Sequence, residues 1–290
     1  MARRKSYSRR RPVSPLLVIL GVAVVLALVW VATQKCSPQD REEQAEVPAL
    51  QKEQTKGADG DALQQVKYAP ALTSQVKDYH GFTVNFNARN GTPNYVAWEL
   101  LADETDGPIA RTNNFWQDPL VKGCPDKSDY SRSGYDRGHM FPAGEAKWNR
   151  EVMEDCFVMT NMCPQAHSLN GGAWKTLEEK ERLWAGRDGR LIVVAGPVYS
   201  DADRERIGEA GVRVPSAFFK VLLAPDIDEP RAIGFMYPND HCPGNMKNYA
   251  MSVDEVEHKT GLDFFSALPD ELENDIESKI SFNAWNNPRR

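Results

Sequence analysis

The chain has 290 residues, and a basic head, an apolar run and a polar stretch at its start leave about 220 residues of globular composition. That length suits one domain with one core, and neither an internal repeat nor a second shift in composition points to two. The net charge of the chain is −6, and because the head carries six positive residues, the rest has a net charge of roughly −12. This charge excludes a broadly basic nucleic-acid-binding surface. Any contact with phosphate must therefore be confined to a local patch.

The first predicted element is a membrane anchor. Residues 1–13 form a basic head, and residues 14–33 contain the charge-free run Pro15–Thr33, which is long enough to cross a bilayer. A cleaved signal peptide would have a shorter apolar region and a small-residue cleavage site, and a core helix would need apolar neighbours that the polar flank does not supply. The arginines place the head in the cytoplasm. We therefore expect a single-pass membrane protein whose remaining chain is extracytoplasmic, in the periplasm or outside the cell.

A polar segment follows over residues 34–66. It is rich in Gln, Glu, Lys, Asp and Gly and contains no aromatic residue, which is typical of a disordered linker. We place a single domain at residues 67–290, with globular character beginning near Tyr68.

Strands are predicted from alternation and from runs of β-branched residues. Phe82–Phe86 and Tyr95–Leu101 flank a turn at Arg89–Pro93, which is the pattern of a hairpin. A continuous apolar run that ends at Gly196-Pro197 suits a strand buried on both faces. This run and two later candidates are Leu191–Ala195, Ala217–Leu223 and Ala232–Met236.

Helices are predicted at four places. Their ranges are Glu145–Glu154, Ser168–Trp184 with Ser168 as the N-cap, Ser252–Lys259 behind a capping box, and an acidic helix that begins at Pro269. Strands and helices are mixed without regular βαβ alternation. The sequence therefore predicts an α+β fold with a mixed, mainly antiparallel sheet.

One candidate catalytic cluster is Asp136-Arg137-Gly138-His139, after a turn-forming stretch. A histidine removes protons near neutral pH, an arginine pairs with phosphate oxygens, and a glycine lets a ligand or a second backbone approach closely. These residue types suit phosphodiester hydrolysis. The alternative is an ordinary half-buried histidine.

A second cluster supplies a candidate metal ligand. Asn170, Trp174 and Glu178 follow at steps of four, so on an α-helix they would share one face. One carboxamide oxygen and one carboxylate are adequate for Mg²⁺, which keeps most of its waters and takes few protein ligands. The alternative is that Asn170 starts the helix and Glu178 lies on a solvated face.

Three motifs in order carry a resemblance to a known family. Asp136–Met140 reads D-R-G-H-M, Thr160–Gln165 reads T-N-x-x-P-Q, and Leu169–Glu178 reads L-N-x-G-x-W-x-x-L-E. This pattern resembles the DNA/RNA non-specific endonuclease family, which includes mitochondrial endonuclease G and secreted bacterial nucleases. The similarity extends from about Phe82 to about Met236. It implies an active-site motif of the ββα-metal (His-Me finger) type.

The resemblance implies a role for each matching residue. His139 looks like the general base that activates water, Asn170 like the direct ligand of Mg²⁺, with Mn²⁺ as the alternative ion, and Glu178 like an outer-shell residue that holds water of the metal. DNA, RNA or both would be the substrate, and phosphate contacts would give little sequence preference.

Three further residues complete the implied site. Arg137 looks like a phosphate or transition-state contact, and Asn161 matches an asparagine that helps to orient the site. Arg111 is the candidate for an additional substrate-binding arginine, because it precedes an aromatic pair and Asp118-Pro119, although this motif is looser than the other three.

The cysteines leave two alternatives open. In an extracytoplasmic domain, four of them could form two disulfides in any of three pairings. These are Cys124, Cys156, Cys163 and Cys242. A zinc site would instead use Cys156, Cys163, His167 and Cys242, but no compact pair of ligands supports it.

The expected function is that of a membrane-anchored, metal-dependent, sugar-non-specific endonuclease. One alternative is a binding module of the same fold that has lost activity, which the acidic body favours and the intact His139, Asn170 and Glu178 oppose. Another is a phosphoesterase of the same fold that acts on a different phosphodiester.

Overall fold

The structure is a computed structural model, and it describes residues 59–200, 202, 204–280 and 282–286. The predicted head (1–13), the predicted anchor (14–33) and most of the predicted linker (34–66) lie outside the described residues. Within the described ranges, every helix is too short or too polar to span a bilayer.

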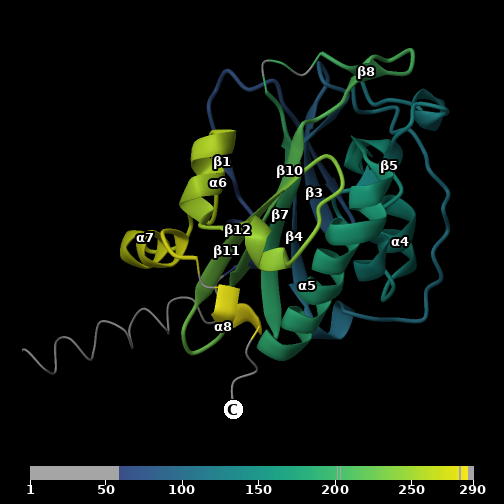
Figure 1. The fold of residues 1–290 in the computed structure, drawn as a ribbon. Helices are drawn as coiled ribbons and strands as arrows, with labels where there is room; N and C mark the ends of the chain where they lie inside the picture. The colour runs from purple at the N-terminus through teal and green to yellow at the C-terminus, as the bar shows by residue number, and fades with distance from the viewer. Residues whose placement is uncertain (1–58, 201, 203, 281, 287–290) are drawn as a thin grey trace, which may run out of the picture. The chain divides into compact units, whose positions relative to one another are not determined.

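A seven-stranded sheet forms the centre of the folded unit (Figure 1). Its order is β12-β11-β10-β7-β4-β3-β2, and each pairing is antiparallel. The predicted hairpin is confirmed as β3 and β4, and the three later strand predictions are confirmed as β7, β10 and β11. The strands are β2 (Gln75–Tyr79), β3 (Phe82–Asn87), β4 (Thr92–Leu101), β7 (Arg190–Val198), β10 (Ala217–Ala224), β11 (Arg231–Pro238) and β12 (Ala250–Met251).

Strands β4 and β7 are longer than predicted, and each includes a proline that the prediction placed outside the strand. β4 already begins at Thr92, so Pro93 belongs to the strand and not to the turn. β7 continues through Pro197 to Val198. The pairing of β7 with β4 ends at Ala195, so the missing N–H of Pro197 costs no hydrogen bond on that side.

Helices cover both faces of the sheet (Figure 1). One core holds the inward residues of α5 (Lys175–Asp188) and α4 (Arg150–Asp155), together with Trp285 of α8 (Phe282–Asn286). The other holds those of α3 (Gly60–Leu63), α6 (Val253–Thr260) and α7 (Asp270–Glu277). Successive residues of β7 alternate between the two cores, which confirms the prediction of a strand buried on both faces and the α+β class.

Two helix predictions need correction. The helix predicted at Glu145–Glu154 begins at Arg150, because the Asn149 side chain accepts hydrogen bonds from the backbone N–H groups of Glu151 and Val152. The helix predicted at Ser168–Trp184 is two segments, η5 (Leu169–Trp174, a π-helical turn) and α5, and Ser168 makes no capping hydrogen bond.

The other two helix predictions are confirmed. Ser252 and Glu255 form the capping box of α6, and α7 follows Pro269. α7 is not the last helix, since α8 comes after it.

The unit that carries the catalytic motifs is a small ββα arrangement beside the sheet. β5 (Asp136–His139) pairs antiparallel with β6 (Met162–Gln165), and η5 and α5 follow. This is the active-site motif that the resemblance implied. The remaining elements are β1 (Lys67–Tyr68), β8 (Arg206–Ile207), β9 (Val212–Arg213), β13 (Leu262–Asp263), η1 (Ala102–Glu104), η2 (Lys127–Tyr130), η3 (Ala143–Glu145), η4 (Met159–Asn161) and η6 (Met246–Tyr249).

The fold begins before the predicted domain boundary at residue 67. α3 lies within the range 34–66 that was predicted to be disordered, and Leu63 and Val66 are buried in the second core. Leu63 and Val66 were missed because the composition of the segment around them is polar.

Neither of the two alternatives left open for the cysteines, disulfides or a zinc site, is present among the described residues. Cys124, Cys156, Cys163 and Cys242 are free thiols. The thiols of Cys156 and Cys242 instead contact backbone carbonyls of their own segments. The cysteines and His167 form no cluster with metal-ligand geometry in the described part of the chain.

Candidate active site

His139 ends strand β5 and is almost fully enclosed, with 6% of its surface exposed. Two aromatic rings flank it, Phe157 edge-on with centroids 5.0 Å apart and Phe115 tilted with centroids 5.8 Å apart. The Trp174 indole Nε1 donates to the His139 carbonyl at 3.3 Å. The ring is therefore held between aromatic walls and its backbone is tied to the start of α5.

The surroundings keep the imidazole neutral. Burial, followed by the positive charge of Arg111, lowers the pKa of His139 to about 3, against the opposing effect of a hydrogen bond with the backbone of Arg137. The ring nitrogen Nε2 is buried and has no hydrogen-bond partner among the described residues. A neutral histidine with a free nitrogen is the form that can accept a proton.

Asn161 fixes the chain next to His139. It is fully buried, and its side-chain Oδ1 accepts from Phe141 N at 2.9 Å. Its Nδ2 donates to the carbonyls of Phe141 and Cys156, and its own carbonyl accepts from Met140 N. All these partners are backbone atoms, so Asn161 positions the turn after His139 and presents no free group to a ligand.

Asn170 lies in η5 beside the start of β5. Its Nδ2 donates to Asp136 Oδ2 at 2.8 Å, and His167 Nδ1 lies 2.8 Å from the same oxygen. This leaves the Asn170 Oδ1 without a hydrogen-bond partner among the described residues. Asp136 therefore orients the Asn170 amide, and no contact between Asp136 and the His139 ring is present among the described residues.

Glu178 lies one turn into α5 and has no hydrogen-bond partner in the described part of the chain. Burial raises the pKa of its carboxyl to about 7, opposed by the positive charges of Lys220, Arg182 and Arg111. Because Arg111 acts on both Glu178 and His139, the two side chains lie in one electrostatic environment.

The two arginines are held differently. The Arg137 Nε and Nη2 both donate to the Lys127 carbonyl, at 3.3 and 2.9 Å, and its guanidinium lies over the Phe115 ring. Arg111 lies over the Phe157 ring at 5.1 Å, and its Nε donates to Asn113 Oδ1. Both terminal nitrogens of Arg111, Nη1 and Nη2, are thus available for a bidentate contact with a phosphate, whereas Nη2 of Arg137 is already paired.

The donor set fits a hard divalent cation. The Asn170 amide offers an unpaired oxygen held by Asp136, and the Glu178 carboxylate is unpaired nearby in sequence on the next helical segment. Mg²⁺ keeps most of its coordinated water molecules and takes few protein ligands. One neutral oxygen and one carboxylate are therefore a suitable donor set for this ion.

The motifs did not point to three neighbours of the site. Phe115 and Phe157 wall the His139 ring, and His167 shares the Asp136 carboxylate with Asn170. The only feature of the sequence that could have pointed to Phe115 is that it lies in the same stretch as Arg111. Phe157 had no local signal, because it follows α4, far from His139 in the sequence, and only the fold brings the two rings together.

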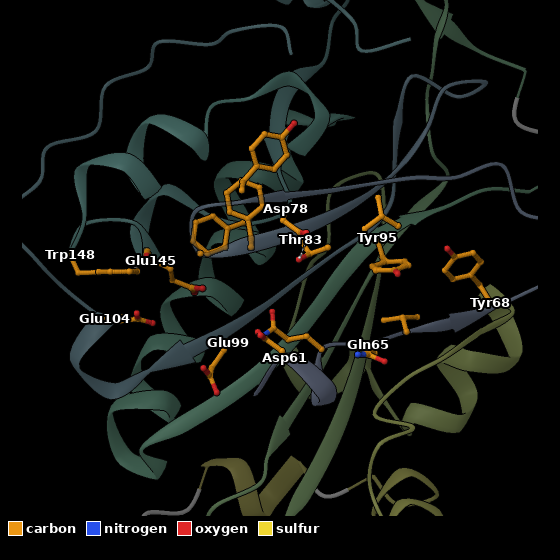
Figure 2. Close-up of a pocket in the computed structure, with 17 residues that line it drawn as sticks. Asp61, Gln65, Tyr68, Asp78, Thr83, Tyr95, Glu99, Glu104, Glu145 and Trp148 are labelled. Atoms are coloured by element: carbon orange, nitrogen blue, oxygen red, sulfur yellow. Dashed lines mark hydrogen bonds between the residues drawn. The ribbon is translucent and has the colours of Figure 1, made fainter. Parts of the chain in front are cut away.

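A cavity of about 730 Å³ lies elsewhere, between α3 and strands β2–β4 (Figure 2). None of the predicted site residues lines it. Its acidic lining would repel a phosphate backbone, so it is not the nucleic-acid site. The acidic residues are Asp61, Asp78, Glu99, Glu104 and Glu145.

The chain is similar to known nucleases over most of its length. A family model described as DNA/RNA non-specific endonuclease matches residues 59–271. A nuclease of Nostoc sp. is 31% identical over 284 residues, covering 90% of this chain and 97% of that protein. A mitochondrial nuclease of Schizosaccharomyces pombe is 30% identical over 222 residues and covers 69% of each chain.

Two further similarities extend to animals and to a solved structure. The mitochondrial nuclease EXOG of Mus musculus is 29% identical over 246 residues, covering 79% of this chain and 67% of that protein. A crystal structure of an EndoG/EndoGI complex matches with a TM-score of 0.65 and 27% identity, over 70% of this chain and 90% of that one.

Proposed function

The chain belongs to the DNA/RNA non-specific endonuclease family, and from that premise we propose a specific mechanism for it. It is a nuclease that hydrolyses nucleic acid, and its family depends on divalent metal ions. In the proposal, His139 is the general base, Asn170 holds Mg²⁺ or Mn²⁺, and the substrate is DNA or RNA without discrimination of the sugar.

The observation that carries the proposal is the state of His139. Its pKa is lowered to about 3, so the ring is neutral at ordinary pH, and Nε2 has no competing partner. In this mechanism the neutral His139 ring takes the proton from the attacking water as the oxygen approaches phosphorus. The hydrogen bonds that join Asn161 and Trp174 to the backbone around His139 hold the base in place.

The cation-binding oxygen would be Asn170 Oδ1, oriented by Asp136. A bound ion would supply positive charge that stabilises the negative charge developing during hydrolysis. Glu178 would accept hydrogen bonds from water in the site, which requires its charged form, and Arg111 and Lys220 favour that form.

Arg111 and Arg137 would stabilise the negative charge that develops at phosphorus. Arg111 would make the bidentate contact, and Arg137 would contribute charge while it holds the Lys127 carbonyl. This confines phosphate binding to a small basic patch on an acidic protein, as the net charge of −6 requires.

The test is hydrolysis of plasmid DNA and of RNA by the full-length chain in Mg²⁺, in Mn²⁺ and in EDTA. We expect activity with metal and none in EDTA. His139→Ala should lower the rate by roughly 100-fold or more, because general-base catalysis contributes about that much. Asn170→Ala should raise the metal concentration needed for half-maximal rate.

The matched control is His80→Ala, since His80 is an exposed histidine that pairs with Asp155 and contacts no site residue. A His139→Ala protein that cleaves at the wild-type rate would refute the assignment of the base. A wild-type chain that binds nucleic acid but never cleaves it would favour the inactive binding module.

We also propose that residues 14–33 anchor the enzyme in a membrane with the catalytic domain extracytoplasmic. The support is the charge-free run beside the arginine-rich head. The full-length chain should sediment with membranes and be released by detergent but not by salt, and protease added to cells whose outer layers have been removed, with the cytoplasmic membrane intact, should digest the domain. Recovery of the full-length chain in the soluble fraction would contradict this proposal.

A further inference from the structure

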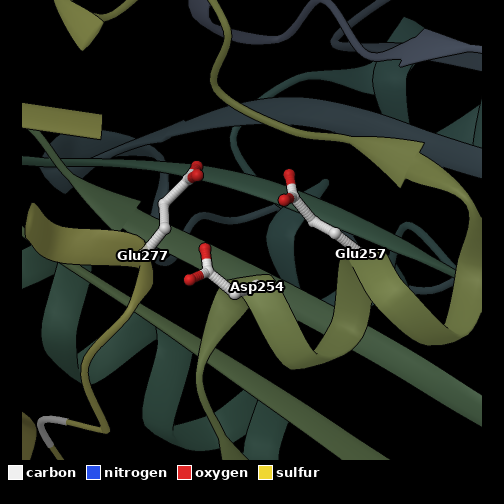
Figure 3. Close-up of side chains that lie close together, drawn as sticks. All are labelled: Asp254, Glu257 and Glu277. Carbon is white, nitrogen blue, oxygen red and sulfur yellow. The ribbon is translucent and has the colours of Figure 1, made fainter. Parts of the chain in front are cut away.

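Three carboxylates converge between α6 and α7. Asp254 and Glu257 lie one turn apart on α6, and Glu277 ends α7. One oxygen from each lies within 4.8 Å of the others, and the three side chains reach toward a common space (Figure 3). No residue of the candidate active site takes part.

Glu277 is the unusual member of this group. Only 4% of its surface is exposed, and its Oε1 is buried with no hydrogen-bond partner in the described part of the chain. A buried carboxylate without a partner is costly, and native proteins normally satisfy such an oxygen with a donor, a water or an ion.

Burial raises the pKa of Glu277 to about 9, and the negative charges of Glu257, Glu273, Asp254 and Asp263 add to this effect. Among the residues that the structure describes, no lysine, arginine or histidine forms an ion pair with the three carboxylates, and the nearby Lys67 pairs with Asp263. Glu277 therefore holds a proton near neutral pH, and a cation that binds to the three carboxylates would displace it.

We propose that Asp254, Glu257 and Glu277 bind a divalent cation, with Ca²⁺ as the best fit, at a structural site that joins α6 to α7. Ca²⁺ takes oxygen ligands at about 2.3–2.6 Å, so two of its ligands can lie up to about 5 Å apart, and a spread within 4.8 Å is compatible with one ion.

The remaining contacts leave room for that ion. Glu257 Oε1 accepts from Phe264 N at 2.8 Å, which fixes this carboxylate and leaves its Oε2 for the ion. Asp254 is exposed, so water completes the coordination from that side. Three carboxylates also distinguish this site from the Asn170 site, which offers a neutral oxygen.

The site would fasten the end of α7 to the first turns of α6, both of which pack on the second core. Its occupancy would therefore change the stability of the protein without any contact to substrate. The inference does not depend on the proposed catalytic mechanism.

The test measures Ca²⁺ binding by titration calorimetry and by thermal unfolding at pH 8. All samples are the full-length chain with Asn170→Ala, so that the active-site ligand is removed. We expect one Ca²⁺ to bind, and a hundred-fold excess over the dissociation constant to raise the Tm by about 5 °C or more. Adding Glu277→Gln should abolish both effects.

Asp254→Asn is the second variant, chosen because an exposed side chain tolerates the change, and it should weaken Ca²⁺ binding at least ten-fold. Asp228→Asn, an exposed carboxylate on the β10–β11 connection, is the control and should bind Ca²⁺ normally. If Asn170→Ala protein shows neither heat nor a Tm shift with Ca²⁺, or if both cluster variants keep them, the site does not exist.

Discussion

At the scale of single residues, the burial of His139 links its chemistry to the stability of the fold. The ordinary pKa of 6.5 falls to about 3 in the folded state, because burial and the charge of Arg111 oppose a second proton on the ring. The folded chain stays neutral at this position between those two values, while the unfolded chain takes up a proton. Stability is therefore complete above about pH 6.5 and is lost as the pH falls toward 3.

His139→Gln removes this titration. Relative to that variant, the wild type should lose roughly 2 kcal/mol of unfolding free energy between pH 8 and pH 5. Urea unfolding of both proteins at each pH measures the difference. If the difference in unfolding free energy between wild type and His139→Gln is the same at pH 8 and at pH 5, the ring is not held neutral. His80→Gln is the contrasting variant: the hydrogen bond with Asp155 raises the pKa of His80, so relative to it the wild type should gain stability as the pH falls.

The two arginines show what side-chain contacts add at this scale. Both were predicted to bind phosphate from their place in the motifs, and Arg111 was the weaker candidate because its motif is looser. The structure leaves both terminal nitrogens of Arg111 available, whereas Arg137 donates from Nε and Nη2 to the Lys127 carbonyl. A sequence motif names a residue but does not say which of its donors are already in use.

At the scale of elements, the β5–β6 pair depends on a glycine. A methyl group on Gly138 would lie 2.5 Å from the Cβ and the Oε1 of Gln165, which is fully buried and has little room to move. Gly138→Ala should therefore destabilise the protein by about 1–3 kcal/mol, as overpacking does. It should also lower activity, because His139 is the next residue.

Gly186→Ala is the comparison for that change. Gly186 is an exposed position inside α5 with nothing within 4 Å of an added methyl group, so alanine should stabilise the helix by up to about 1 kcal/mol. Thermal unfolding of wild type, Gly138→Ala and Gly186→Ala measures the stability change that each substitution causes. Equal effects of the two substitutions would mean that β5 and β6 are not as close as described.

Another glycine explains the wrong helix prediction. The spacing of Asn170, Trp174 and Glu178 predicted one continuous α-helix, but Gly172 has φ −111° and ψ −111°, outside the helical region. The break gives Asn170 a different direction from α5, so its amide reaches Asp136, while Trp174 points into the core and to the His139 carbonyl. Periodicity cannot detect such a break, because a glycine is compatible with both conformations.

At the scale of the whole molecule, a buried ion pair joins α5 to the sheet. Lys220 Nζ of β10 donates to Glu181 Oε2 at 3.0 Å, and both side chains are fully buried. The ammonium also lies over the rings of Trp98 and Trp174, at 5.3 and 4.6 Å. The same Trp174 contacts His139, so the pair supports the site through the core.

Lys220→Met should destabilise the protein by about 3–5 kcal/mol, because it leaves Glu181 charged and buried without a partner. Adding Glu181→Leu should recover most of that loss, since the orphaned charge is then gone. Urea unfolding of the two variants measures both effects. If the Lys220→Met variant is as stable as wild type, or if the double variant is less stable than Lys220→Met alone, the ion pair does not have the proposed role.

The sequence by itself determined the features that depend on neighbours along the chain. The strand alternation, the capping box of α6, the order of the three motifs and the family they indicate are local patterns, and comparison with known proteins confirmed the family. The predicted anchor at 14–33 and the catalytic roles of His139, Asn170 and Glu178 remain predictions of the same kind.

Only the tertiary structure decided which distant residues meet. Phe115 and Phe157 enclose His139, Lys220 neutralises Glu181, and Glu277 joins the carboxylates of α6, each across a long separation in sequence. The free state of the four cysteines was decided in the same way. Such contacts are set by packing and burial, which shift pKa values and occupy donors, and no local pattern of residues encodes them.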